Sequence, residues 1–145
     1  MRIILTLLIF VNFNLYAQDN CNLDVDGTAK KHYNKAKRLA DDLRFSESLQ
    51  LLNKAIEVQS DYPNAYFLMG RIYELKKDML NAKTYYEKTI EVCPMHSPLV
   101  YWFLASSEMD NKSFKKAKKH FTRYLEFLSL PQENKVMARH QLKIA

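Results

Sequence analysis

The chain has 145 residues, of which only 2 are glycine, 4 are proline and 26% are charged. This length allows one domain with a modest core, and the composition favours helices over turn-rich β structure. The net charge of +6 counts little toward nucleic-acid binding, because the amino-terminal segment predicts export away from cytosolic DNA and RNA.

Residues 1–17, MRIILTLLIFVNFNLYA, have the pattern of a secretory signal peptide. Arg2 gives a positive start, residues 3–11 are apolar, and Ala17 is a small residue suited to cleavage. The apolar run is too short to span a bilayer as a helix, which takes about 20 residues. We therefore expect an exported protein; an uncleaved anchor or a buried first helix is the alternative.

A linker is expected at 18–28, and it contains the first of two cysteines, Cys21 and Cys93. An exported protein can form disulfides, but two cysteines so far apart in sequence give no framework that predicts a bridge. The residues before Cys21 do not resemble those before a lipidated cysteine. Cys93 is expected to be a small buried hydrophobe, and pairing of the two is left open.

Residues 29–130 repeat with a period of 34 to 35 residues. Three columns of structural positions share this period: Ala36, Gly70 and Ala105; Ser48, Ala82 and Ala117; Leu52, Tyr86 and Phe121. Strand patterns are missing from the sequence. The period predicts three helical hairpins, at 29–62, 63–96 and 98–130.

The middle unit carries the fullest motif: Tyr66-x2-Met69-Gly70-x2-Tyr73, then Ala82-x3-Tyr86, then Pro94. With this motif the chain resembles the tetratricopeptide repeat family, a helix–turn–helix of 34 residues. The resemblance implies an all-α fold, a right-handed superhelical solenoid of about three units plus a carboxy-terminal helix. The third unit departs from the motif at Glu108, where the family has an aromatic residue, and the first unit is degenerate.

Prolines and a glycine mark the expected helix geometry. Pro63, Pro98 and Pro131 fall where helices should begin, a position that tolerates a missing N–H. Residues 131–145 read as a helix that caps the third unit or is truncated from something longer. Glycine inside a helix costs about 1 kcal/mol relative to alanine, so we expect Gly70 to lie at a close crossing, facing the region of Ala82.

No motif of the chain is typical of catalysis. The histidines lack metal-ligand spacing, and no glycine-rich phosphate loop or Gly-x-Ser-x-Gly occurs. We therefore predict no enzyme activity, no cofactor and no metal site.

The first helix of each unit carries the candidate partner-binding groove. In the family that the chain resembles, the column one residue after the motif aromatic faces the inner groove, where peptides or partner helices lie. With the next positions along that face, the candidates are Tyr33, Lys37, Phe67, Arg71, Trp102 and Ser106. Aromatic and arginine side chains favour this use; the alternative is that the rings only pack between hairpins.

The last repeat helix has an apolar stripe and a basic face. The expected stripe contains Phe114, Ala117, Phe121, Tyr124, Leu125 and Leu128. The basic face contains Lys115, Lys116, Lys118, Lys119 and Arg123. It is a solvated surface or a patch for an acidic partner or an anionic membrane.

A signal segment followed directly by three repeats resembles, more weakly, the front of OmpA-family envelope proteins. This implies a location in the periplasm or on the periplasmic face of the outer membrane, in an assembly or secretion complex. We therefore expect an exported scaffold for protein–protein interaction. The alternatives are a self-associating structural protein and the front fragment of a longer peptidoglycan-associated protein.

Overall fold

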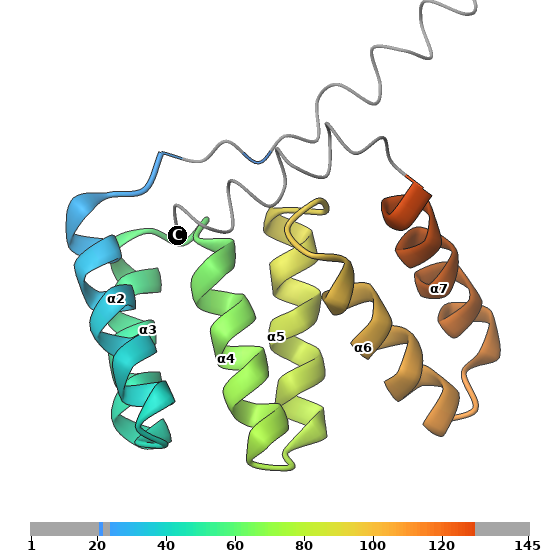
Figure 1. Cartoon of the computed structure of the whole chain (residues 1–145), viewed down its shortest axis with the longest axis horizontal. Helices are drawn as coiled ribbons and strands as arrows, with labels where there is room; N and C mark the ends of the chain where they lie inside the picture. The colour runs from blue at the N-terminus through green and yellow to red at the C-terminus, as the bar shows by residue number, and fades with distance from the viewer. Residues whose placement is uncertain (1–20, 22–23, 130–145) are drawn as a thin grey trace, which may run out of the picture.

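The computed structural model describes residue 21 and residues 24–129, and Figure 1 shows their path. The described part contains six helices and no strand, which confirms the predicted all-α solenoid. The helices are α2 (Gly27–Asp41), α3 (Phe45–Val58), α4 (Pro63–Leu75), α5 (Met79–Val92), α6 (Pro98–Asp110) and α7 (Phe114–Ser129). The predicted signal peptide at 1–17 and the predicted helix at 131–145 lie outside the described residues.

The six helices form three hairpins that stand side by side in a row (Figure 1). Within the hairpins α2 packs on α3, α4 on α5 and α6 on α7; between them α3 contacts α4 and α5 contacts α6. The first helices α2 and α4 also touch directly. Each hairpin therefore buries its apolar face against its neighbours, as in solenoid proteins.

Local chemistry places the helix starts. Pro63 and Pro98 are the first residues of α4 and α6, where no N–H is needed. The Ser97 hydroxyl accepts a hydrogen bond from the Leu99 N–H at 3.3 Å. The Asp26 carboxylate accepts from two N–H groups in the first turn of α2, which also lowers the pKa of this carboxyl.

The turn inside each hairpin has the same backbone conformation. Leu43, Lys77 and Lys112 adopt φ values of 60°, 62° and 56°, although none is glycine. In each turn the next residue donates its N–H to a carbonyl five residues earlier, as Arg44 does to Leu39 at 2.8 Å. These are Schellman motifs, and they recur with the same 34- and 35-residue steps as the sequence repeat.

The repeat columns lie in the core, with one exception. Ala36, Ser48, Leu52, Gly70, Ala82, Tyr86, Ala105 and Ala117 are buried, and Phe121 is half-buried. In the first hairpin the Ser48 hydroxyl donates to the Ala36 carbonyl at 2.8 Å, so a polar residue is satisfied there. The nearest neighbour of a Cβ atom at Gly70 would be the ring of Tyr86, which lies one turn beyond Ala82 on α5.

The apolar stripe of α7 is only partly buried. Ala117 is fully buried, but Phe114, Leu125 and Leu128 are 60%, 61% and 44% exposed. The other hairpins cover such residues with the next unit, and no further hairpin follows α7 in the described part. The apolar stripe of α7 is therefore covered at Ala117 and exposed at these three residues.

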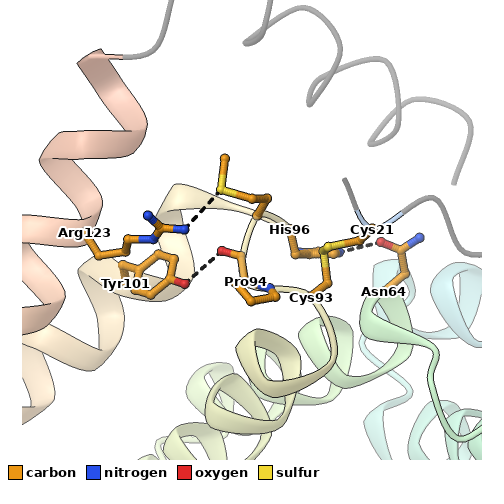
Figure 2. Close-up of a disulfide and its surroundings, with 8 residues drawn as sticks. Cys21, Asn64, Cys93, Pro94, His96, Tyr101 and Arg123 are labelled. Carbon is orange, nitrogen blue, oxygen red and sulfur yellow. Dashed lines mark hydrogen bonds between the residues drawn. A yellow bond between two sulfur atoms is a disulfide. The ribbon is translucent and has the colours of Figure 1, made fainter. Parts of the chain in front are cut away.

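Cys21 and Cys93 form a disulfide across 72 residues of sequence, with a Cα–Cα distance of 5.5 Å (Figure 2). Cys93 is buried, as expected, but it is not a free thiol. Nearby, the Gln59 side chain donates to the Asp24 carbonyl at 3.1 Å and accepts from the Asp26 N–H at 2.8 Å. The segment before α2 is therefore attached at both the first and the second unit.

Candidate functional site

The aromatic column of the first helices is not uniform. Tyr33 is only 8% exposed, and its ring packs on Tyr62 with centroids 5.3 Å apart. Phe67 is half-buried between the rings of Tyr86 and His96, at 6.0 and 5.1 Å. Trp102 is 46% exposed. Tyr33 thus belongs to the core, and Trp102 is the aromatic side chain of this column that is open to a partner.

Trp102 is open on one side and supported on the other. Its ring lies 5.6 Å from the Phe121 ring and 5.5 Å from the Tyr124 ring, both on α7. Such contacts between aromatic edges and faces are favourable and fix the orientation of the indole. A partner would therefore meet a preoriented ring.

The polar candidate residues on the same helices differ in exposure and in whether they are already paired. Arg71 lies 3.6 Å from the Glu74 carboxylate, and its guanidinium lies 5.7 Å from the centre of the Phe103 ring. Lys37 is exposed and forms no ion pair with any described residue, whereas Ser106 is half-buried. We call the candidate positions of α2, α4 and α6 the first-helix face. On this face Arg71 is paired with a carboxylate, whereas Lys37 is not paired with a described residue.

A buried histidine that the sequence did not single out lies beside this face. His96 is 9% exposed, and its Nε2 is 2.5 Å from Asn64 Oδ1 at the start of α4 (Figure 2). Burial lowers the pKa of His96 to about 4, so the ring is neutral at neutral pH. With the proton on Nε2, the buried Nδ1 has no hydrogen-bond partner. No ligand spacing in the sequence marks this residue.

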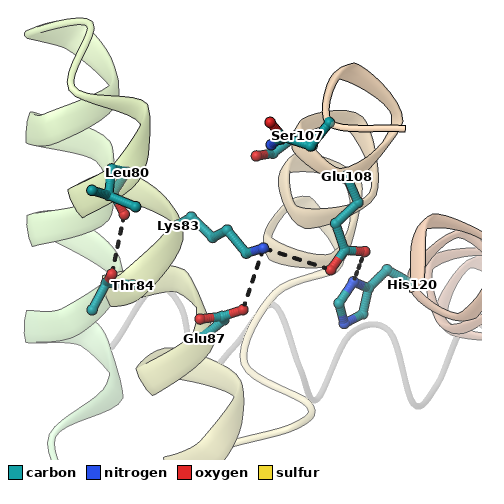
Figure 3. Close-up of polar contacts among 8 residues, drawn as sticks. Leu80, Lys83, Thr84, Glu87, Ser107, Glu108 and His120 are labelled. Carbon is teal, nitrogen blue, oxygen red and sulfur yellow. Dashed lines mark hydrogen bonds and ion pairs between the residues drawn. The ribbon is translucent and has the colours of Figure 1, made fainter. Parts of the chain in front are cut away.

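Glu108, the departure from the repeat motif, is a buried carboxylate with two cationic or polar partners (Figure 3). It is 2% exposed; its Oε2 lies 2.9 Å from His120 Nδ1, and its Oε1 lies 3.9 Å from Lys83 Nζ. Lys83 also approaches Glu87 at 3.8 Å. These contacts replace the aromatic packing that the family motif supplies at this position, and they join α5, α6 and α7.

The basic face of α7 borders a cleft rather than open solvent alone. Lys115, Lys118, Lys119 and Arg123 line a cleft of about 560 Å³ between α7, α6 and the end of α5. Lys116, the fifth predicted member of this face, is exposed and does not line it. The structure therefore separates four of the basic residues from the fifth.

Neither a metal centre nor a membrane-spanning helix is found within the described residues. No group of three or more His, Cys, Asp or Glu side chains there could hold a metal ion. The helices of that part are also too short or too polar to cross a bilayer.

Comparison with protein families gives one match: residues 63–95 fit the model of the tetratricopeptide repeat. No curated protein matches the sequence. The resemblance to OmpA-family proteins stays a prediction.

Solved structures share the fold at low identity. The crystal structure of MamA is 24% identical with a TM-score of 0.63, over 77% of this chain and 63% of that one. The second TPR of Spaghetti (RPAP3), bound to the HSP90 peptide SRMEEVD, is 11% identical with a TM-score of 0.61, over 77% and 98%. The CopN–Scc3 complex is 13% identical with a TM-score of 0.65, over 86% and 78%. This chain therefore spans less than two thirds of the MamA structure.

The fold of these hairpins is one that serves as a scaffold for protein–protein interaction. The middle hairpin matches the family model, and the flanking hairpins repeat its turn, its buried columns and its packing. Residues 63–95 thus match the tetratricopeptide repeat, and the three described hairpins share the fold of the solved tetratricopeptide-repeat structures.

Proposed function

We propose that this protein is an exported scaffold that binds a polypeptide along its first-helix face and performs no chemistry. The observation that carries the proposal is Trp102, which is 46% exposed while Phe121 and Tyr124 hold its ring. A preoriented aromatic side chain loses little entropy on binding, and such side chains dominate binding energy at interfaces.

The remaining side chains of this face indicate the kind of partner. Phe67 adds apolar surface, and the cations Lys37 and Arg71 favour a segment that also carries carboxylates. Structures of Spaghetti with the HSP90 peptide SRMEEVD give a precedent for peptide binding by this fold. The lysine–asparagine clamp that grips a terminal carboxylate is absent from this sequence, so we expect an internal segment as the ligand.

Export is supported by two independent features. Residues 1–17 have the signal-peptide pattern, and the Cys21–Cys93 disulfide is a bond that persists in oxidising compartments. With the weaker OmpA resemblance, these features favour the periplasm or the periplasmic face of the outer membrane, within an envelope assembly. If the protein touches an anionic membrane, the basic face of α7 is the surface for that contact.

Export is tested by fractionating cells that make the full chain or a form without residues 2–17. The full chain should reach the envelope fraction with no thiol reactive toward a mass-adding maleimide after unfolding. The truncated form should stay in the cytosol with both thiols reactive. Equal distribution of the two forms would argue against an export signal.

Partner binding is tested by placing a photo-crosslinking amino acid at position 102. The matched control is position 80, because Leu80 is 78% exposed but lies on α5, away from the first-helix face. We expect a discrete crosslinked product from position 102 only, and its loss on adding Lys37→Glu. Equal crosslinking from both positions would remove the first-helix face as the site.

Self-association is the second candidate function, and the exposed apolar residues of α7 favour it. Phe114, Leu125 and Leu128 are exposed apolar side chains on the last described helix of the row. Light scattering across a concentration series decides between the two candidates. A mass that rises with concentration and returns to that of a monomer in Leu125→Lys would support stacking, whereas a constant monomer mass would exclude it.

A further inference from the structure

The described side chains that line the cleft beside α7 carry more positive than negative charge. Its lining consists of Ile90, Pro94, Tyr101, Lys115, Lys118, Lys119, His120, Thr122, Arg123 and Glu126. The three lysines are exposed, and none forms an ion pair with a described residue. Glu126 is the one carboxylate among the described residues of the lining, and Arg123 already lies 3.3 Å from it. The cleft therefore has an excess of positive charge.

The floor of the cleft is recessed and apolar. Tyr101 lines the cleft although it is only 5% exposed, and its hydroxyl already donates to the Pro94 carbonyl at 2.8 Å. Ile90 and Pro94 extend this apolar floor along the end of α5. A volume of about 560 Å³ lies within the range of ligand sites and accommodates several side chains.

The spacing of the lysines matches an extended acidic peptide. Lys115 and Lys119 are about one helical turn apart, roughly 6 Å along α7. Alternate residues of an extended peptide are about 6.6 to 6.8 Å apart and point the same way. Carboxylates at alternate positions can therefore pair with successive lysines, while the intervening residues lie against the apolar floor. A membrane surface would meet the protruding residues of α7 and would not reach Tyr101.

We propose that this basic cleft is a second binding site, which takes an acidic segment of a polypeptide with carboxylates at alternate positions. It uses side chains of α5, α6 and α7 that do not belong to the first-helix face. The protein can then hold two segments, of one partner or of two. The proposal does not depend on Trp102, so the two sites can be tested separately.

The test measures fluorescence anisotropy of a labelled peptide, Gly-Glu-Leu-Glu-Leu-Glu-Gly, with the purified protein at low ionic strength, where charge pairing is least screened. The control peptide has glutamine in place of each glutamate. We expect saturable binding of the acidic peptide and at least about tenfold weaker binding of the control. Trp102→Ala should bind the acidic peptide as the wild type does.

Two charge-reversed variants decide whether the cleft is the site. Lys115→Glu/Lys119→Glu should weaken binding by about tenfold or more, whereas Lys116→Glu/Lys112→Glu makes the same charge change outside the lining and should weaken it less than about threefold. Unchanged circular dichroism melts would show that both variants fold. Equal weakening by the two variants, or no saturable binding by the wild type, would overturn the proposal. So would loss of binding to phosphatidylglycerol vesicles in the cleft variant without any peptide binding, which would identify a membrane site.

Discussion

The ring of Tyr86 occupies the space that a side chain on Gly70 would need. A Cβ atom at Gly70 would lie 2.6 Å from Cε1 and 2.7 Å from Cδ1 of Tyr86, far inside van der Waals contact. The ring cannot easily move away, because it stacks on Phe103 at 5.1 Å and its hydroxyl donates to Glu74 Oε2 at 2.6 Å. Glycine is therefore required at position 70 because the ring of Tyr86 leaves no space for a side chain there.

Gly70→Ala is expected to destabilise the protein by about 1 to 3 kcal/mol, because overpacking outweighs the roughly 1 kcal/mol that alanine gains in a helix. Urea unfolding followed by circular dichroism measures the change. Gly27→Ala is the matched control, since a Cβ there meets nothing within 4 Å, and we expect no loss of stability. A Gly70→Ala protein as stable as the wild type would refute the packing account.

Removing the disulfide by Cys21→Ser/Cys93→Ser should lower the free energy of unfolding by about 2 to 4 kcal/mol. The bond spans 72 residues, so its loss releases much conformational entropy in the unfolded chain. Urea midpoints with and without reductant provide the measurement. Reductant should shift the wild type toward the double variant and leave the variant unchanged; a wild type insensitive to complete reduction would contradict this.

His96 should make stability depend on pH in a defined window. Burial lowers its pKa from 6.5 to about 4, so between these values the unfolded chain binds a proton that the folded chain does not. Its contribution is complete above about pH 6.5 and is lost as pH falls toward 4, by about 3 kcal/mol. The measurement is the free energy of unfolding as a function of pH for the wild type and for His96→Phe. The difference between the two curves isolates the contribution of His96, and parallel curves would contradict the prediction.

The half-buried partners of Glu108, Lys83 and His120, should contribute to stability. Lys83→Met and His120→Phe each leave a buried carboxylate short of a partner, and we expect a loss of about 1 to 3 kcal/mol in each case. Lys54→Met is the control, because Lys54 is exposed and forms no ion pair with a described residue. Thermal melts compare the three variants, and equal stability would show that Glu108 is satisfied in another way.

The hairpin turns offer a stabilising substitution. A residue with a Cβ at φ near +60° is strained by about 1 to 2 kcal/mol, and glycine relieves this strain at some entropic cost. Lys77→Gly should therefore stabilise the protein by about 0.5 to 1 kcal/mol in urea unfolding. Lys76→Gly, one residue earlier at φ −76°, should destabilise it instead. If both variants lose stability, the left-handed backbone conformation of Lys77 does not destabilise the wild type.

Much of the fold could be predicted from the sequence because repeat period and helix boundaries are local properties. Pro63 and Pro98 fixed two helix starts, and the 34-residue period aligned residues that the structure buries together. Contacts between hairpins could not be predicted in this way, because they depend on the folded arrangement of distant residues. The disulfide depends on the fold bringing residue 21 to residue 93, and spacing alone carries no such information.

The sequence predicts which repeat positions form the candidate site, but it does not predict how exposed each side chain is. Tyr33 and Trp102 occupy equivalent repeat positions, yet Tyr33 meets Tyr62 and is buried, whereas Trp102 stays 46% exposed. The burial of Tyr33 goes with its contact with Tyr62, a side chain that the repeat motif does not specify. In the same way, the lysine run gave the charge of α7, but only packing against α6, beside the end of α5, turned part of it into a cleft.

The bond between Cys21 and Cys93 also determines how the chain would carry tension. The covalent ring closed by that bond contains α2 to α5, so a pull applied before Cys21 and after α7 bypasses those four helices. The load falls on α6 and α7, which would unravel first while the ring keeps its length. Under reducing conditions every hairpin would bear the force in series, and the extension before rupture would grow accordingly.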